Sequence, residues 1–258
     1  MRIIAGPCQH ESYEQSLQIA HHCADVCSKY EAEYIFKASY DKANRSHISG
    51  GRGKGMNETL VTFLEMKQSI PDLKILTDVH TEFQIEDIMD MYDNAVDVLQ
   101  IPAFLCRQTD LIELACDTDK IVNIKKGQFM APWDVKGILS KTANAKEAWI
   151  TERGTSFGYG RLVNDFTGML DNISYLGKNF VYDVTHSVQL PGSQGTATGG
   201  NRDYVPGLCR AGAALGIESF FIEVHPDPDN APSDGANMLK LDDFEKVIND
   251  IDCYSYTR

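Results

Sequence analysis

Apolar runs rich in β-branched residues alternate along the chain with segments whose apolar residues recur at helical spacing. The runs predict eight strands: Arg2–Cys8, Tyr34–Ser39, Lys74–Val79, Ala95–Ile101, Ile121–Lys125, Ala148–Glu152, Phe180–Thr185 and Ser219–Val224. Each is followed by a stretch long enough for a helix, such as Tyr13–Lys29, Glu58–Ser69, Glu82–Tyr92 and Asn201–Leu215. Because strands that alternate with helices form parallel sheets, eight such units predict a closed (β/α)8 barrel.

An open, doubly wound sheet is the alternative interpretation of the same alternation. The dinucleotide-binding form of that fold has Gly-x-Gly-x-x-Gly after its first strand, and no such motif follows Arg2–Cys8. No linker, internal repeat or low-complexity tract interrupts the pattern. We therefore expect a single barrel domain over residues 1–258.

Composition agrees with a folded α/β protein, because 43% of the 258 residues are hydrophobic and no apolar run has the length of a membrane helix. The segment Met1–Ala5 enters a strand pattern directly, so no signal peptide is expected. The seven cysteines are scattered and odd in number, which is typical of reduced thiols. We expect the protein in the cytoplasm.

The net charge of −13 argues against nucleic acid or an anionic membrane as a partner. The segment from Lys37 to Lys54 reverses this balance, because it holds five basic residues and a single acid, Asp41. Its Gly-rich part, Gly50–Gly55, lacks the ending of a P-loop, and it is either a phosphate cradle or a plain surface loop. A basic stretch in an acidic protein indicates a site for a small anion.

Each predicted strand ends at, or just before, a residue that can carry chemistry. These residues are Cys8, Lys37, Asp78, Gln100, Lys125, Glu152 with Arg153, His186 and Glu223. In a barrel all these ends meet at one mouth, where active sites lie. Lys125 and Arg153 end neighbouring strands, so we expect them to converge on one phosphate. Lys126 should face the other side of its strand as a solvated or paired lysine.

A second group of strand-end residues has the chemistry of metal ligands. Cys8, His186 and Glu223 end the first, seventh and eighth strands, which become neighbours when the barrel closes, and Asp234 follows in the next loop. Any one of them alone would be read as a packed or hydrogen-bonded residue. Together they mix soft and hard donors, which suits Zn, Fe, Mn or Co better than Ca or Mg. His225 should point to the opposite face of its strand.

The chain resembles the 3-deoxy-D-manno-octulosonate 8-phosphate synthases in ordered blocks over nearly its whole length. The matching blocks are Ile4–Cys8, Lys42–Ser46, Thr77–His80, Gln100–Asp110, Asn123–Phe129, Glu152–Tyr159, Asp183–Gly192 and Glu223–Pro228. The resemblance implies a homotetrameric barrel that condenses phosphoenolpyruvate with D-arabinose 5-phosphate and water. The products would be an eight-carbon lipopolysaccharide sugar precursor and inorganic phosphate.

The resemblance also implies roles for individual positions. The phosphoenolpyruvate phosphate would be held by Lys125, Arg153, Gln100 and the backbone near Ala103. Its carboxylate would be held by Lys37, Ser39 and Lys42. The sugar phosphate and its chain would be bound by Asn44, Arg45, Ser46, Asp78 and, from a neighbouring subunit, Arg107. Gln189 is taken as a further substrate-binding position.

In the metal-dependent branch of these synthases the ligands match Cys8, His186, Glu223 and Asp234, whereas the metal-free branch has Asn at the position of Cys8. Cys8, His186 and Asp234, together with Lys42 near the aldehyde, form the expected catalytic set. The chain departs from the usual pattern at Ser49–Gly53 and at 194–202.

Two other functions stay open. One is a related synthase that uses erythrose 4-phosphate, although such enzymes usually read Lys-Pro-Arg-Thr where this chain has Lys42-Ala43-Asn44-Arg45. The other is a catalytically inactive barrel that only binds a metal or a sugar phosphate. The ring of charged strand ends argues against the second, because unused buried charges are costly.

Overall fold

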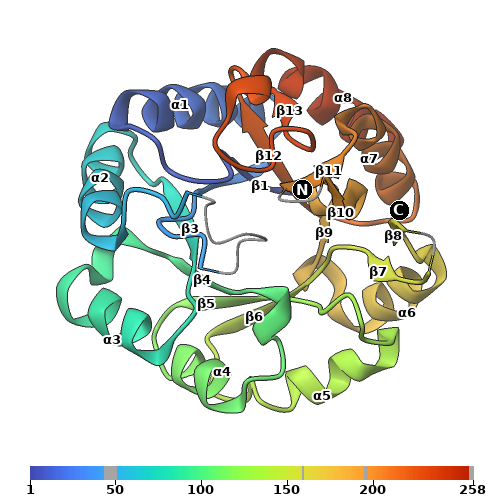
Figure 1. The fold of residues 1–258 in the computed structure, drawn as a ribbon, viewed down its shortest axis with the longest axis horizontal. Coiled ribbons are helices and arrows are strands. Elements are labelled where there is room, and N and C mark those ends of the chain that lie inside the picture. The colour runs from blue at the N-terminus through green and yellow to red at the C-terminus, as the bar shows by residue number, and fades with distance from the viewer. Residues whose placement is uncertain (44–50, 159, 195–196, 256–258) are drawn as a thin grey trace.

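Eight parallel strands close into a barrel in the computed structural model, which describes residues 1–43, 51–158, 160–194 and 197–255 (Figure 1). In ring order they are β1 (Arg2–Gly6), β2 (Glu33–Lys37), β3 (Lys74–Asp78), β4 (Val98–Ile101), β5 (Ile121–Lys125), β6 (Glu147–Glu152), β9 (Phe180–Asp183) and β12 (Ser219–His225). β12 pairs with β1, with Arg2 opposite Ser219, and this pairing closes the ring. The predicted barrel is confirmed.

Helices form an outer ring around the strands (Figure 1). They are α1 (Tyr13–Lys29), α2 (Met56–Ser69), α3 (Glu82–Met91), α4 (Thr109–Cys116), α5 (Val135–Leu139), α6 (Phe166–Leu176), α7 (Val205–Ala214) and α8 (Phe244–Tyr254). α1 has the predicted bounds because the Ser12 hydroxyl accepts a hydrogen bond from the Gln15 N–H and so caps its first turn. In the part of the chain that is described, no helix is long and apolar enough to cross a membrane.

Four of the predicted strands run one or two residues too far where the chain leaves the barrel, and the predicted fourth strand begins three residues too early. β1 ends at Gly6 rather than Cys8, and a Cβ at Gly6 would lie 2.1 Å from the Lys37 carbonyl oxygen, so only glycine fits there. β4 begins at Val98 rather than Ala95, because Asp93–Ala95 form a 3-10 turn. The residue types near the end of a strand therefore do not show which residue makes the last hydrogen bond to the neighbouring strand.

Three short strand pairings were not predicted from the sequence. β7 (Thr155–Ser156) pairs with β8 (Leu162–Val163), and β10 (Gln189–Gln194) pairs with β11 (Ala197–Gly200). β13 (Leu239–Lys240) adds to the end of β12. They follow β6, β9 and β12 in the chain, so they belong to the loops on the carboxyl side of the barrel.

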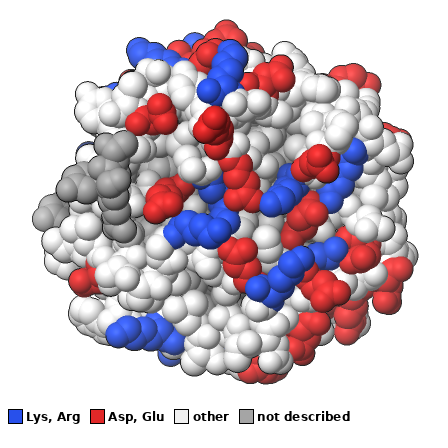
Figure 2. Space-filling view, turned by 180° about the vertical axis from the view of Figure 1, so that it is seen from behind, with Lys and Arg blue, Asp and Glu red and all other residues white. Residues whose placement is uncertain are grey.

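The barrel interior is a small apolar cluster, separate from the larger core between strands and helices. It consists of Ile4, Ile35, Leu76, Val98, Trp149, Val181 and Phe221. At the amino end, the Arg2 guanidinium lies 3.9 Å from the centre of the Trp149 ring and pairs with Glu33 and Glu147. The face of the molecule opposite that of Figure 1 has Lys and Arg side chains next to Asp and Glu side chains (Figure 2). Apolar packing therefore fills the barrel below its carboxyl mouth.

Shortening a side chain inside the barrel should lower the free energy of unfolding, because the surrounding strands cannot move in to fill the cavity. We expect Leu76→Ala to lower the free energy of unfolding by about 2–5 kcal/mol. The matched control is Val61→Ala on the exposed face of α2, which should change it by about 0.5 kcal/mol or less. Denaturant unfolding of the two variants measures both values, and equal losses would contradict a packed interior.

Candidate active site

Ionisable side chains gather at the carboxyl mouth of the barrel and are almost inaccessible to water. The buried ones include Cys8, Lys37, Asp78, Lys125, Arg153, Asp183 and Glu223. Six of them lie at or just beyond the last residue of a strand, and Glu223 lies two residues before the end of β12. They meet because the carboxyl ends of parallel strands form one mouth. The structure therefore brings together the strand-end residues that the sequence singled out.

Cys8, Glu223 and Asp234 form a compact group of metal-type donors. The Cys8 sulfur and one carboxylate oxygen from each of the two acids all lie within 4.8 Å of one another. The Cys8 thiol donates a hydrogen bond to Asp234 Oδ2 over 3.2 Å. Asp234 has a φ of 53°, a left-handed backbone that is costly for this residue and is typical of functional loops.

His186 lies at the edge of this group. Its Nε2 is 3.8 Å from Glu223 Oε2, and its Nδ1 is 2.8 Å from Asp183 Oδ2. The four predicted ligands are thus neighbours, but the tight group consists of three of them. The imidazole contacts the group through Glu223.

The donor set fits a borderline divalent metal. Glu223 Oε2 is buried and has no hydrogen-bond partner among the described residues, so one carboxylate oxygen is left for a ligand. Burial raises the pKa of the Cys8 thiol, and Glu223 raises it further. The sulfur therefore carries a proton, which a bound cation would displace. Burial alone would raise the pKa of Asp234, but His186 and Lys42 lower it to about 2. A thiolate, an imidazole and two carboxylates match Zn, Fe, Mn or Co.

Lys125 and Arg153 provide positive charge next to this group, since Lys125 lies beside His186 and Gln189 links Arg153 to Asp234. Lys125 Nζ donates to Asp183 Oδ2 over 2.6 Å and lies 3.8 Å from the centre of the Phe221 ring. Arg153 Nη2 donates to Gln189 Oε1 over 2.5 Å, while Arg153 Nη1 is buried with no hydrogen-bond partner among the described residues. Burial lowers the pKa of both cations. An anion bound there would satisfy the free guanidinium nitrogen.

Lys37 and Lys42 converge on the backbone carbonyl of Cys8. Each ammonium donates to that oxygen over 2.8 Å. Lys37 also donates to Glu223 Oε1 over 2.7 Å, and Lys42 donates to the Ser39 hydroxyl over 2.9 Å. Burial alone would lower the pKa of Lys42, but nearby acidic groups, the Cys8 thiol and then Asp78, raise it above its usual value. Lys42 therefore remains an ammonium.

Asp78 completes this corner of the site. It accepts a hydrogen bond from Ser39 and lies 3.3 Å from His80 Nε2. Burial opposes its ionisation, but Lys42 and His80 lower its pKa to about 2. The basic stretch of the sequence is partly neutralised, because Arg52 pairs with Asp41 at 2.5 Å.

The other predicted substrate-binding positions are less closely grouped. Gln100 accepts a hydrogen bond from Asn123 over 3.0 Å, and Ala103 is buried at the start of a short 3-10 turn. Arg107 is exposed, and its carbonyl accepts from Lys141 over 2.8 Å. The three predicted sugar-binding positions that lie outside the described residues are Asn44, Arg45 and Ser46.

Two acidic residues with structural importance were given no role from the sequence. Asp183 bonds to both Lys125 and His186, and His186 and Lys125 keep its pKa well below the usual value although burial opposes this. Glu152 lies 3.1 Å from the buried Lys126 ammonium and accepts the Arg153 N–H over 3.0 Å. The signal in the sequence was a carboxylate at the end of an apolar strand segment. Lys126 is paired, as predicted.

His225 lies outside the compact group of metal-type donors. Its Nε2 contacts Glu11 Oε1 at 2.8 Å and Gln15 Nε2 at 3.0 Å, and its Nδ1 accepts the Asp227 N–H. These partners lie before and within α1 and after β12. These contacts hold His225 apart from the donor group; the alternation of side chains along β12 does not, because residues two apart along a strand share a face.

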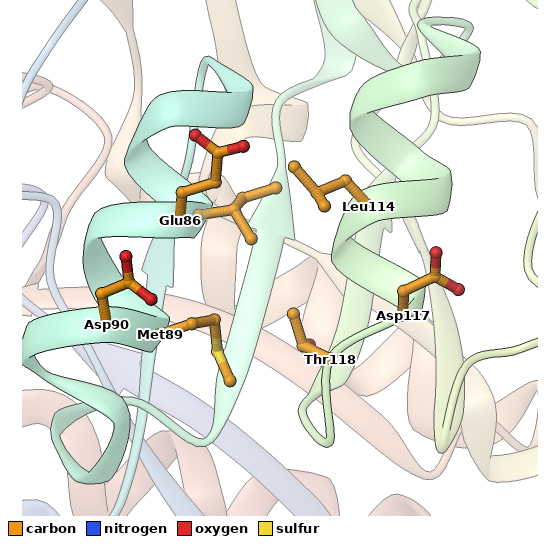
Figure 3. Close-up of a pocket in the computed structure, with 7 residues that line it drawn as sticks. Glu86, Met89, Asp90, Leu114, Asp117 and Thr118 are labelled. Carbon is orange, nitrogen blue, oxygen red and sulfur yellow. The ribbon is translucent and has the colours of Figure 1, made fainter.

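A pocket of about 360 Å³ lies elsewhere, between α3 and α4 on the outside of the barrel (Figure 3). Its lining residues are Ile85, Glu86, Met89, Asp90, Leu114, Asp117 and Thr118. It includes none of the mouth residues. The mouth is the candidate active site because the buried ionisable groups and the metal-type donors gather there.

Comparison with known proteins defines the class. The model of the DAHP synthetase I family matches residues 1–253, and the chain belongs to this family. Similar curated proteins are named 2-dehydro-3-deoxyphosphooctonate aldolase. That of Bradyrhizobium diazoefficiens is 47% identical over 95% of this chain and 86% of its own length. Those of Chelativorans sp. and Caulobacter vibrioides are 48% and 47% identical, each over 96% of this chain, and over 88% and 85% of their own lengths.

Proposed function

We propose that this protein condenses phosphoenolpyruvate with D-arabinose 5-phosphate and water, giving 3-deoxy-D-manno-octulosonate 8-phosphate and inorganic phosphate. The observation that carries the proposal is the unpartnered nitrogen of buried Arg153, beside Lys125 and next to the Cys8–Glu223–Asp234 group. The name of the relatives supports the carbon count, because a three-carbon enol phosphate and a five-carbon aldose give an octonate.

In this proposal the cations bind the two ends of phosphoenolpyruvate. Lys125 and Arg153 hold its phosphate, with Gln100 and the backbone near Ala103 beside it. Lys37, Ser39 and Lys42 hold its carboxylate. Gln189 keeps the Arg153 guanidinium in place, since its Oε1 accepts from Nη2. Fixing both ends leaves C3 of the enol free to face the aldehyde.

The second substrate is held by the other side of the mouth. Asp78 binds a sugar hydroxyl, and Asn44, Arg45 and Ser46 bind the sugar phosphate region together with Arg107 of a neighbouring subunit. Lys42 stays protonated because of the acidic groups around it, so its Nζ can donate to the aldehyde oxygen. Negative charge that develops on this oxygen as the bond forms is thereby stabilised.

Three bond changes complete the reaction. C3 of the enol attacks the aldehyde carbon, and a water oxygen adds at C2. The resulting hemiketal phosphate loses inorganic phosphate by cleavage of its C–O bond. Lys125 and Arg153, which hold the phosphate at the start, also stabilise it as it leaves.

Cys8, His186, Glu223 and Asp234 would hold a divalent metal of the Zn, Fe, Mn or Co type. When bound, this cation supplies positive charge that orients the aldehyde and a water molecule. The support is the donor chemistry and the unpartnered Glu223 oxygen. Which of these metals binds is a question for elemental analysis.

We also propose a homotetramer in the cytoplasm. Phe104, Phe129 and Trp133 lie after β4 and β5 and are 64%, 59% and 71% exposed, so contact with a second copy would bury apolar area close to Arg107. All seven cysteines are unpaired thiols, which supports a reducing compartment.

Substrate choice tests the proposed reaction directly. Phosphate release is measured with phosphoenolpyruvate and each of a panel of aldose phosphates. Arabinose 5-phosphate should give the highest kcat/KM, since this chain has Lys42-Ala43-Asn44-Arg45 where enzymes that use the shorter sugar have Lys-Pro-Arg-Thr. A tenfold preference for erythrose 4-phosphate would assign the protein to the other synthase, and no release with any sugar would favour an inactive barrel.

Arg107→Ala tests the role of the neighbouring subunit. Loss of a charge-assisted contact should cost about 1.5–3 kcal/mol, so the KM for arabinose 5-phosphate should rise about 10- to 150-fold, with little change for phosphoenolpyruvate. The control is Arg210→Ala, whose guanidinium pairs with Asp250 on α8. Equal effects on both substrates, or a fully active monomer, would contradict this role.

Metal dependence should follow from Cys8. Chelation with EDTA or dipicolinate should abolish turnover, and Mn, Co, Cd or Fe(II) should restore it to different degrees. Cys8→Ala should lose metal and activity, whereas Cys8→Asn should keep partial activity that chelators do not affect. Cys253→Ala on the exposed side of α8 is the matched control. Metal-free wild-type protein with full activity would make Cys8 a packed thiol only.

A further inference from the structure

Asp183 is the last residue of β9 and is completely inaccessible to solvent. Its Oδ2 accepts from Lys125 Nζ over 2.6 Å and contacts His186 Nδ1 at 2.8 Å, while its Oδ1 accepts the His186 backbone N–H over 2.9 Å. One carboxylate therefore contacts the proposed phosphate-binding lysine and a proposed metal ligand.

These contacts determine which nitrogen of His186 carries the proton. A carboxylate that already accepts from an ammonium and a backbone N–H has no proton to give, so the hydrogen of the short contact lies on Nδ1. Lys125 Nζ is 3.4 Å from the same Nδ1, a longer contact than that of Asp183. In the neutral imidazole, which is the form that binds a metal, Nε2 then has the lone pair and lies 3.8 Å from Glu223 Oε2.

The backbone contact adds orientation to the choice of tautomer. Because Oδ1 binds the His186 N–H and Oδ2 binds its ring, the carboxylate fixes both ends of the residue. The ring of His186 also packs against Phe221, with centroids 5.8 Å apart. Lys125 donates to the same oxygen as the ring contacts, Oδ2, and so helps to hold the carboxylate in place. The imidazole therefore has one ring orientation, which directs Nε2 toward the donor group.

We propose that Asp183 is a positioning residue that acts through His186, by holding its Nε2 lone pair toward the Cys8–Glu223–Asp234 group. The inference rests on the metal site of the proposed function. Carboxylates that orient ligating histidines usually raise metal affinity 10- to 100-fold. Asp183 would contribute to metal affinity without being a ligand itself.

The test is titration of the metal-free full-length protein with Co²⁺, followed by calorimetry and by the visible absorption of the bound ion. Asp183→Asn should weaken Co²⁺ binding about 10- to 100-fold. His186→Ala should also weaken it, and the double variant should bind no more weakly than His186→Ala alone, since Asp183 acts through that ring. Losses that multiply in the double variant, or wild-type affinity in Asp183→Asn, would overturn the proposal.

Two further variants control for folding. Asp165→Asn makes the same chemical change at the cap of α6, where an amide oxygen can still accept the Gly168 N–H, so Co²⁺ affinity should not change. Asp183→Glu keeps the charge but displaces the carboxylate. If Asp183→Asn does not fold, Asp183→Glu takes its place in the comparison of the single and double variants. It should bind Co²⁺ at least threefold more weakly than wild type, and unchanged affinity would refute the positioning role.

This experiment separates the inference from the proposed function. Co²⁺ binding is measured without either substrate, so it does not depend on which sugar the protein uses. A wild-type protein that binds Co²⁺ but releases no phosphate with arabinose 5-phosphate would refute the proposed reaction. The Co²⁺ affinities of the single and double variants would still test the positioning role of Asp183. A wild-type protein that binds no Co²⁺ would refute the metal site and this inference together, while the phosphate-release assay still judges the reaction.

Discussion

Charged groups at the carboxyl mouth are packed where water barely reaches, and breaking a buried pair typically costs about 3–5 kcal/mol. The described structure meets this constraint with short contacts, such as Lys37 to Glu223 at 2.7 Å and Lys125 to Asp183 at 2.6 Å. Arg153 Nη1 and Glu223 Oε2 are among the buried atoms that have no hydrogen-bond partner there. They mark the positions at which we propose that an anion and a metal bind.

The barrel makes this arrangement possible by separating packing from chemistry. Its interior is filled by apolar side chains around Trp149, and Arg2 covers that ring at the amino end. Stability then comes from layers that do not take part in the site, while the strand ends carry polar groups. The apolar layer also supports the site where the two meet, because the Phe221 ring packs against both Lys125 and His186.

The proposed anion and metal sites share partners. Asp183 contacts Lys125 and His186, and Gln189 accepts from Arg153 while donating to Asp234 over 2.8 Å. Each bridge therefore joins one phosphate-binding cation to one metal-type donor. Substitutions in either site are expected to affect the other, so their energies should not add.

The sequence by itself determined the order of strands and helices, the bounds of Tyr13–Lys29 and the residues at the strand ends, because these follow from local periodicity and capping. It did not show where each strand leaves the ladder, since that depends on close contacts such as Gly6 with Lys37. Only the tertiary structure decided that Asp183 joins Lys125 to His186, because Lys125 is 58 residues away along the chain. Buried charged groups pair with groups that lie close to them in space, and only closure of the barrel brings these residues close together.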